Sequence, residues 1–502
     1  MTENTRIGSN DKTTSGTPPV RVRYAPSPTG MQHIGGIRTA LFNYFFARSR
    51  RGTFILRVED TDQTRFHPEA LEDIYESFRW LGISADESPA AGGDYGPYVQ
   101  SQRLELYREH ARRLVEAGRA YWDYTSASVQ RSEGEEAVPY NYSGRNLSES
   151  QIREYQEQGV TPVLRLLVPA EGEAVFEDLV LGRIKRKHKD LPPDPILMKS
   201  DGYPTYHLAN VIDDHLMEIS HVLRAQEWVP STPLHLLIYG AFGWDPPQFA
   251  HLPMVMGKDG SKLSKRHGST SLVEFRRQGY LSEAVTNYIS LLGWSLDDSR
   301  EFFTRDDLES LFTLERINKA PAVFDYRKLE WFNGQYLRDL PEERLTAELL
   351  PYIQEAGWAQ SPASAADRDR LVALLPLIRE RLKVLSDVVP LLRFVYEEVQ
   401  QWPLEELIPK QADAASAAVW LDAAWQVVVQ TGTDDEQTLD DALRVAAEKL
   451  DTKLGNLLMP LRVAITGSRV SPPLVGSIRE LGMERAAARV AGARRVLESE
   501  TN

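Results

Sequence analysis

Residues 23–36 read Arg23-Tyr-Ala-Pro-Ser-Pro-Thr-Gly-Met-Gln-His-Ile-Gly-Gly36, and this stretch decides how the first domain is built. Val20–Tyr24 has the pattern of a strand, and the two prolines that follow force a turn. Apolar residues then recur at helical spacing, which predicts a helix over 37–48. A strand that passes directly into a helix points backbone N–H groups and the positive helix end at a phosphate.

A second stretch, Gly257-Lys-Asp-Gly-Ser-Lys-Leu-Ser-Lys-Arg266, is a basic loop interrupted by glycines that can move onto a polyphosphate. Lys262 and Lys265 supply mobile point charges for phosphate oxygens. The loop lacks the G-x-x-x-x-G-K-[ST] spacing, which disfavours a P-loop enzyme. In the first stretch, His33 precedes two glycines and can donate a hydrogen bond to a phosphoryl group. Together the two stretches predict a nucleotide site that is split across one domain.

Strand and helix patterns alternate around the first stretch. Thr53–Val58 reads as a strand and 68–81 as a helix, and this order implies a parallel sheet with ligands at the strand ends. A helix over 102–120 and strand patterns at 163–168, 174–179 and 196–199 follow before the alternation resumes at 221–224 and 232–242. Beyond Ser271 the apolar spacing is helical, over 281–293, 306–312, 343–356, 365–388, 414–430, 437–450 and 479–497.

These patterns predict an α/β fold with several domains. Residues 1–19 read as a disordered tail, and the nucleotide domain consists of 20–101 and 208–275. An α+β insertion, 102–207, separates its two halves. An all-α region completes the chain, with breaks that suggest subdivision into 276–342, 343–398 and 399–502.

Bulk composition narrows the classes of function. The chain has 502 residues and no cysteine, which excludes disulfides, thiol catalysis and cysteine-ligated zinc. Its ten histidines are scattered, so we expect no metal centre. No long apolar run or signal-peptide pattern occurs, so we expect a cytoplasmic protein without a membrane segment. The net charge of −14 means that a nucleic-acid partner must bind local basic patches.

Charged residues outside the two stretches give further candidates. Glu59, Asp60 and Asp62 follow a predicted strand, where they can bind an amino group or a ribose, help to hold Mg²⁺, or form a solvated turn. Arg23 and Arg224 offer guanidinium forks for carboxylates. The densest basic run contains Arg183, Lys185, Arg186, Lys187 and Lys189, and it is either a phosphate-contacting strip or a solvated face.

The motifs together resemble those of the class I aminoacyl-tRNA synthetases, and most closely the bacterial type of the glutamyl enzymes. Arg23–Gly30 with His33–Gly36 is similar to the glutamyl form of the family's HIGH motif, and Lys262–Arg266 is similar to its KMSKS loop. Other segments match in the same order, namely Arg57–Asp62, Asp201–Tyr206, Arg224–Trp228 and Trp331–Gly334. The glutaminyl relatives read Pro-x-Pro-Asn-Gly in the first motif and end in β-barrels, whereas this C-terminal region reads as helical.

The resemblance implies an ATP-dependent ligase that attaches L-glutamate to tRNA(Glu) through a glutamyl-adenylate, releasing AMP and pyrophosphate. It implies a Rossmann-like catalytic domain with Mg²⁺, an acceptor-end-binding insertion, a stem-contact domain over 276–342 and two anticodon-binding domains over 343–398 and 399–502. We expect a monomer. The alternative within the family is a non-discriminating enzyme that also charges tRNA(Gln) with glutamate.

Site residues follow from the same resemblance. Catalysis is expected from His33, Lys262 and Lys265. The residues expected to bind ATP are Pro26, Gly35, Gly36, Glu227, Trp228, Val255, Lys262, Ser264, Lys265 and Arg266. Those expected to bind glutamate are Arg23, Ala25, Ser27, Glu59, Tyr206, Asn210 and Arg224. Those expected to contact tRNA are Arg183, Lys185, Arg186, Lys187 and Arg381.

Many relatives hold zinc in the insertion through cysteines, whereas the matching stretch here is Tyr121-Trp-Asp-Tyr-Thr125, so we predict no zinc. The segment Ile378–Leu382 resembles the one with an arginine that reads the third anticodon base in discriminating enzymes. Arg381 is the candidate and Arg379 the alternative.

Two other classes of function stay open at this point. An RNA-binding regulatory protein would keep the fold without the chemistry, but the intact His33, Lys262 and Lys265 disfavour it. A nucleotidyltransferase of the same superfamily shares a histidine motif, but the long helical C-terminal region and the segment Arg224–Trp228 disfavour that reading.

Overall fold

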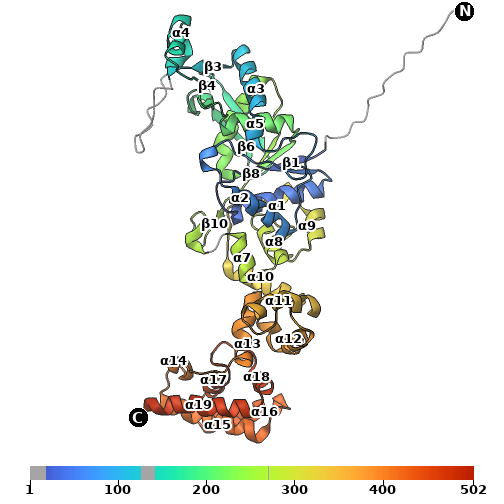
Figure 1. Ribbon diagram of the computed structural model, residues 1–502, viewed down its shortest axis with the longest axis vertical. Helices are drawn as coiled ribbons and strands as arrows, with labels where there is room; N and C mark the ends of the chain where they lie inside the picture. Colours follow the sequence, from blue (N-terminus) through green and yellow to red (C-terminus); the bar gives the residue numbers. More distant parts are fainter. Residues whose placement is uncertain (1–18, 126–141, 269–270, 502) are drawn as a thin grey trace, which may run out of the picture. The chain divides into compact units, whose positions relative to one another are not determined.

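The computed structural model describes residues 19–125, 142–268 and 271–501, with Lys265 and Thr501 described by their backbone alone. The chain forms two compact units (Figure 1). Unit 1 contains the residues up to Glu274 together with Val285–Asp325, and unit 2 contains Phe275–Ala284 together with the residues from Tyr326 onward.

Unit 1 is built on parallel strands, as the sequence pattern predicts. β1 (Arg21–Tyr24) pairs with β2 (Thr53–Leu56), and β8 (His221–Ala225) pairs with β9 (Gln248–Leu252). The two pairs adjoin because the Ser220 N–H donates to the Arg21 carbonyl at 3.0 Å and the Arg21 N–H donates to Ser220 Oγ at 2.8 Å. The carboxyl ends of these strands therefore share one edge, which is where open α/β sheets bind ligands.

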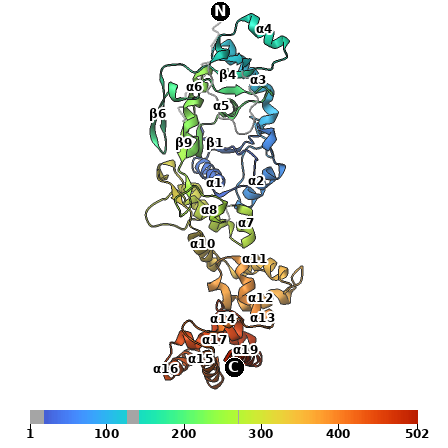
Figure 2. The same ribbon diagram turned by 90° about the vertical axis from the view of Figure 1, so that its left-hand side faces the viewer.

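The other strands of unit 1 extend or flank this sheet. The hairpin of β5 (Glu173–Asp178) and β6 (Gly182–Lys187) joins β9 through a parallel pairing of Asp178 with Phe249, and β6 forms the outer edge (Figure 2). The hairpin lies within 102–207, so part of the predicted insertion shares the sheet of β8 and β9. A separate antiparallel sheet has the order β3-β4-β7, with β3 (Ala120–Asp123), β4 (Val163–Leu166) and β7 (Ile196–Met198), and a short parallel pair consists of β10 (Val255–Met256) and β11 (Ala322–Val323).

Helices surround these sheets. The helices up to residue 325 are α1 (Ile34–Ser49), α2 (Pro68–Leu81), α3 (Leu104–Glu116), α4 (Glu149–Glu157), α5 (Tyr206–Leu216), α6 (Thr232–Phe242), α7 (Leu272–Gln278), α8 (Ser282–Ser290) and α9 (Arg305–Leu311). The apolar sides of α3, α5 and α6 bury one core together with β3, β4 and β7. This core holds α5 firmly, and α5 carries several residues of the site described below.

Unit 2 is helical and has two cores. One core lies among α10 (Tyr326–Asp339), α11 (Glu342–Glu355), α12 (Ala365–Ile378) and α13 (Val388–Tyr396). The other lies among α14 (Leu404–Leu407), α15 (Ala414–Thr431), α16 (Glu436–Lys449), α17 (Leu454–Thr466), α18 (Leu474–Leu481) and α19 (Met483–Thr501). The predicted fold class, a parallel-sheet α/β domain followed by a helical region, is thus confirmed.

Two helices predicted as continuous are interrupted. The helix predicted over 365–388 ends at Ile378, because the Asp387 carboxylate accepts hydrogen bonds from the Lys383 and Val384 N–H groups and holds a turn there. The helix predicted over 479–497 is divided at Gly482, whose φ of 83° does not continue a helix.

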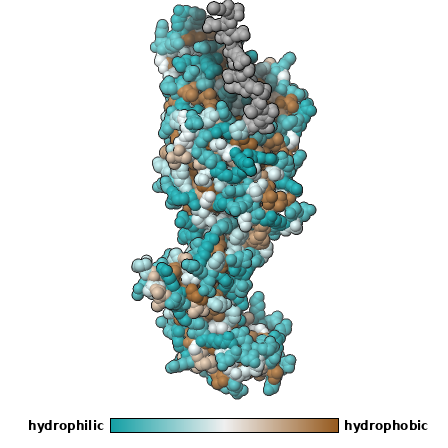
Figure 3. All heavy atoms as spheres, turned by 90° about the vertical axis from the view of Figure 1, so that its right-hand side faces the viewer, coloured by the Kyte–Doolittle hydropathy of each residue, from teal (hydrophilic) through white to brown (hydrophobic). Residues whose placement is uncertain are grey.

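No helix among the described residues is long and apolar enough to cross a membrane. On the face of the molecule in Figure 3 the hydrophobic residues are scattered among hydrophilic ones.

The two units differ in histidine content, because all ten histidines of the sequence lie in unit 1. Burial is the first cause that lowers the pKa of His33, His110, His207, His215, His221, His235 and His251. The unfolded chain binds these protons at about pH 6.5, whereas the folded chain binds them only at lower pH. The free energy of unfolding of unit 1 should therefore fall as the pH drops through that range.

We predict that amide hydrogen exchange, corrected for intrinsic rates, shows a larger loss of protection in unit 1 than in unit 2 between about pH 7.5 and 5.5. Mass spectrometry of peptides from the full chain resolves the two units. An equal loss in both would contradict the assignment of the acid sensitivity to the histidines.

Candidate functional site

A cavity of about 950 Å³ lies at the carboxyl ends of β1, β8 and β9. The segments that follow these strands form its walls, together with α5 and the basic loop at 257–266. Most of the predicted site residues line it, namely Arg23, Ala25, Ser27, His33, Gly35, Gly36, Glu59, Tyr206, Asn210, Arg224, Glu227, Trp228, Val255, Lys262 and Ser264. Residues from both ends of the domain's sequence thus meet in one cavity.

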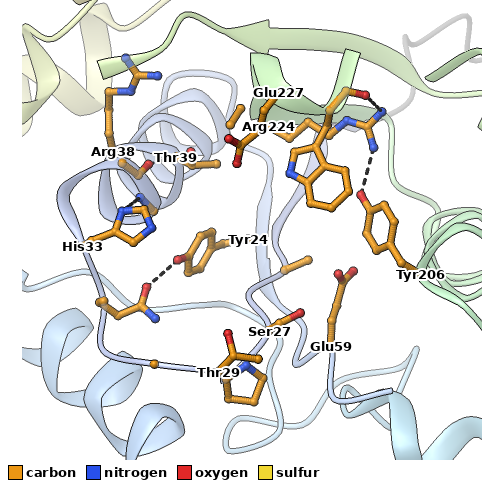
Figure 4. Close-up of a pocket in the computed structure, with 18 of the residues that line it drawn as sticks. Tyr24, Ser27, Thr29, His33, Arg38, Thr39, Glu59, Tyr206, Arg224 and Glu227 are labelled. Carbon is orange, nitrogen blue, oxygen red and sulfur yellow. Dashed lines mark hydrogen bonds between the residues drawn. The ribbon is translucent and has the colours of Figure 1, made fainter. Parts of the chain in front are cut away.

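His33 begins α1 and faces this cavity (Figure 4). Its Nδ1 accepts a hydrogen bond from the Gly36 N–H at 3.3 Å, so the neutral ring carries its proton on Nε2. Burial by the cavity walls, followed by the charge of Lys262, lowers the pKa of His33 and favours this neutral form. Gly36 is required here because a Cβ on it would stand 2.9 Å from the Tyr24 hydroxyl. The helix end and the imidazole N–H therefore both present donors to an anion.

The basic loop supplies a cation on the same side of the cavity. Lys262 Nζ lies 2.6 Å from a Glu227 carboxylate oxygen, and both side chains are partly exposed. The side chain of Lys265 lies outside the described residues. Arg266 bonds to Ser261 and Asp259 and is not among the lining residues, unlike Ser264. An incoming polyphosphate would compete with Glu227 for Lys262.

The other end of the cavity contains Arg224, which is buried. Its guanidinium donates a hydrogen bond to the Tyr206 hydroxyl at 3.1 Å (Figure 4), and the Tyr206 ring packs against Trp228 with centroids 4.5 Å apart. Burial raises the pKa of Tyr206, so its hydroxyl keeps a proton to donate. Arginine and tyrosine together form a site for a carboxylate.

Arg23 and Arg57 are buried and are paired with acids. Arg23 forms a bidentate pair with Asp214 at 3.0 and 3.1 Å, and Arg57 contacts Asp214 at 2.7 Å and Glu59 at 3.0 Å. With its amide oxygen turned toward the two arginines, Asn210 accepts from both and donates to Asp214. Burial alone would raise the pKa of Asp214, but the two arginines lower it and keep this carboxylate ionised. The network leaves Glu59 facing the cavity, where it suits a cationic amino group.

The three carboxylates predicted as a group do not converge on one point. Glu59 pairs with Arg57, whereas Asp60 accepts from the Ser101 N–H and from Gln63. Asp62 is tied to Thr64 and Arg65 on the surface. In the part of the chain that the structure describes, no cluster of three or more His, Asp or Glu side chains could hold a metal ion.

Pro26 and the residues of the basic strip are not among the residues that line the cavity. The Pro26 carbonyl accepts from the Glu59 N–H. Four residues of the basic strip lie on the edge strand β6, and Lys189 follows it. The side chains of Arg183 and Lys185 lie 3.6 Å from those of Glu177 and Glu173 on β5. Charged side chains on an edge strand also prevent its pairing with other strands.

The two arginines proposed as anticodon readers differ in exposure. The Arg379 guanidinium is half-buried and donates to the Leu340 carbonyl. Arg381 is exposed. Burial first, and then the positive charge of Arg381, lower the pKa of Arg462. Arg381 is thus the one presented to solvent.

Sequence reasoning missed the residues that hold the site together. Asp213 and Asp214 anchor the buried arginines from α5, and His235, His251 and Thr232 surround Arg224. Two adjacent acids within Leu208–Leu216, a segment whose other residues are mostly apolar, were the only sequence signal for the first pair.

The comparisons with known proteins agree with this geometry. The family model described as the catalytic domain of class I tRNA synthetases (E and Q) matches residues 19–331, and the one described as an anticodon binding domain matches residues 344–494. A glutamate–tRNA ligase of Borrelia duttonii is 49% identical over 92% of this chain and 93% of its own. One from Treponema denticola is 47% identical over 94% of this chain and 98% of its own.

Solved structures give the same result. A crystal structure of a glutamate tRNA ligase from Elizabethkingia meningosepticum in complex with its amino acid has a TM-score of 0.77 and 32% identity. The match covers 95% of this chain and 99% of that one.

His33 allows a test that separates helix capping from ligand binding. Replacing His33 by Asn keeps a side-chain acceptor for the Gly36 N–H, whereas replacement by Ala removes it. We predict that His33→Ala lowers the free energy of unfolding by about 1 kcal/mol and His33→Asn by less. Both should weaken ATP binding by about tenfold, because neither places a donor at the position of the imidazole Nε2–H. Chemical unfolding and equilibrium ATP titration measure the two effects; unchanged ATP affinity in His33→Asn would remove His33 from the ligand site.

Proposed function

The chain belongs to the class I tRNA synthetases for glutamate and glutamine, and from that membership we propose that it is a glutamate–tRNA ligase. The observation that carries the proposal is one cavity with donors for a polyphosphate at one end and an arginine–tyrosine pair for a carboxylate at the other. The reaction joins L-glutamate to tRNA(Glu) at the expense of ATP.

The reaction has two steps. A carboxylate oxygen of glutamate attacks the α-phosphorus of ATP, the bond to the β-phosphate oxygen breaks, and pyrophosphate leaves with glutamyl-adenylate remaining. A terminal ribose hydroxyl of the tRNA then attacks the glutamyl carbonyl, loses its proton, and displaces AMP. Both steps depend on positioning and on stabilising charge that develops on phosphoryl oxygens.

The polyphosphate end of the cavity supports the roles proposed for His33, Gly35, Gly36 and Lys262. The start of α1 and the His33 Nε2–H point donors at the phosphates, and Lys262 exchanges Glu227 for a phosphate oxygen. Lys265, Ser264 and Val255 are proposed to act there too. Mg²⁺ would neutralise the phosphates of bound ATP, and the absence of cysteine supports an enzyme without zinc.

The carboxylate end supports glutamate as the amino acid. Arg224 and the Tyr206 hydroxyl suit the side-chain carboxylate, and Glu59 suits the α-amino group. Glutamine lacks the charge that a buried arginine requires, and a site that leaves buried polar groups unpaired can reject the wrong substrate by 10⁴-fold or more, as an order of magnitude. This selection needs no separate editing site.

Unit 2 and strand β6 are proposed to bind tRNA. The match of residues 344–494 to an anticodon binding domain supports this role, with Arg381 rather than Arg379 reaching the RNA. Arg186 and Lys187 are proposed to contact the tRNA phosphate backbone, and Arg183 and Lys185 are proposed to do so after they leave their glutamate partners.

The substrates favour a cytoplasmic enzyme, and we propose that it acts as a monomer. The relatives are named for glutamate alone, so a non-discriminating enzyme is not favoured.

We predict that the purified full chain catalyses glutamate-dependent exchange of pyrophosphate into ATP in the presence of tRNA(Glu). Charging of tRNA(Glu) with labelled glutamate should follow. Glutamine in place of glutamate should give exchange that is lower by about 10⁴-fold. The absence of exchange with every tRNA supplied would overturn the proposed function.

Replacing Arg381 by Gln should relax the choice between tRNA(Glu) and tRNA(Gln), because one cation that reads a base is lost. We expect the ratio of kcat/KM for the two tRNAs to fall by about tenfold, within the range for one base contact. Arg379→Gln is the matched control and should leave that ratio unchanged. The opposite pattern would assign the reading to Arg379, and two unchanged ratios would place the reader elsewhere.

A further inference from the structure

The buried arginines of the site differ in the charge of the groups that hold them. Arg23 and Arg57 are bonded to the carboxylates of Asp214 and Glu59. Arg224 is 5% exposed, and no described residue gives it a carboxylate partner. The first two charges are therefore balanced within the protein, whereas that of Arg224 is not.

The partners of Arg224 are all uncharged acceptors. Its Nε–H donates to His251 Nε2 at 3.1 Å, and one Nη1–H donates to His235 Nδ1 at 3.3 Å. Its Nη2 donates to Thr232 Oγ1 at 2.8 Å and to the Trp228 carbonyl at 3.4 Å. With the Tyr206 contact at 3.1 Å, these bonds account for the five N–H donors of the guanidinium.

The hydrogen bonds fix the tautomers of the two histidines. His251 Nδ1 lies 2.6 Å from Asp178 Oδ2, so it carries the proton and leaves Nε2 free to accept from Arg224. His235 accepts on Nδ1 and therefore presents its Nε2–H to His207 Nδ1 at 3.1 Å. Burial first, and then Arg224, lower the pKa of His235, which keeps its ring neutral.

Asp178 is the nearest acid in this chain of contacts, and other hydrogen-bond donors already compensate its charge. Its carboxylate accepts from His251 and from the N–H groups of Val180 and Leu181 in the β5–β6 turn. The His251 ring stands between it and Arg224. His251 and His235 are 0% and 1% exposed, so water does not reach Arg224 from their side.

We propose that His235 and His251 are positioning residues that select the charge of the substrate: they hold Arg224 through neutral acceptors and so keep its positive charge for an anionic side chain. The inference rests on the proposed function, because it takes the ligand of Arg224 to be the side-chain carboxylate of the amino acid. The longest contact, from Nη2 to the Trp228 carbonyl at 3.4 Å, is the one that this carboxylate would replace. An internal acid at the same place would bind Arg224 itself and remove the preference for charge.

Paired variants of equal shape test this idea. His235→Glu places a carboxylate beside Nη1 of Arg224, and His235→Gln places a neutral acceptor of the same length there. Thr232→Asp and Thr232→Asn form a second pair at the start of α6, where an acidic residue suits the helix. This pair decides the question if His235→Glu does not fold, as judged by circular dichroism.

The measurement is the ratio of kcat/KM for glutamate to that for glutamine in pyrophosphate exchange with saturating tRNA, with calorimetric titration of each amino acid alongside. We expect each acidic variant to lower the ratio by about tenfold or more, mainly through a higher KM for glutamate. Each amide variant should stay within about threefold of the unaltered protein, and the KM for ATP should not change. A purely structural role predicts equal effects within each pair.

Equal ratios within both pairs, or acidic variants with an unchanged ratio, would overturn the proposal. Glutamate-dependent pyrophosphate exchange by the unaltered protein is measured first, before the variants are compared. If that protein shows no glutamate-dependent exchange, the proposed function fails, whereas an active protein with indistinguishable pairs refutes only the role of the neutral acceptors.

Discussion

Two adjacent buried carboxylates, Asp213 and Asp214 on α5, are the constraint on which the site depends. Asp214 binds Arg23 from β1 and Arg57 from the end of β2. Asp213 accepts from Gln100 and Arg103 just before α3 and from Tyr107 within α3. Removing one partner of a buried ion pair leaves an uncompensated charge, which costs about 3–5 kcal/mol. The pair therefore fixes α5 to both the sheet and the helix that opens the inserted segment.

This anchoring explains how distant segments form one cavity. Parallel strands bring their carboxyl ends to one edge, and the loops after β1, β8 and β9 then need only short extensions to meet. α5 adds Tyr206 and Asn210 from the far side because its acids hold it against β1 and β2. Glu59 takes its place from the same network through Arg57.

The cationic side chains in and around the cavity have different hydrogen-bond and ion-pair partners. Among the described residues, Arg23 and Arg57 have carboxylate partners, Lys262 has an exposed partner that a ligand can displace, and the partners of Arg224 are neutral. In a water-excluded site an unbalanced charge interacts far more strongly than it would in solvent. Under the proposed function, this difference in partners separates structural, exchangeable and recognising roles among residues of similar chemistry.

The sequence by itself determined the parallel-sheet class, the helical C-terminal region and the turn that leads from β1 into α1, because prolines, glycines and apolar periodicity act locally. It also placed Arg23, His33, Arg224 and Lys262 among the candidates, since the order of the motifs carries that information. It did not reveal that Arg381 is exposed while Arg379 is tied to the Leu340 carbonyl, or that Gly482 divides a predicted helix.

Only the tertiary structure decided which charges are balanced. Asp214 lies 191 residues from Arg23, and His251 lies 27 from Arg224, so no local pattern links either pair. Arg23 and Arg224 look alike in the sequence as guanidinium forks for a carboxylate. Folding gives the first an internal acid and the second neutral acceptors, because burial makes each charge depend on the few groups that the fold brings into contact with it.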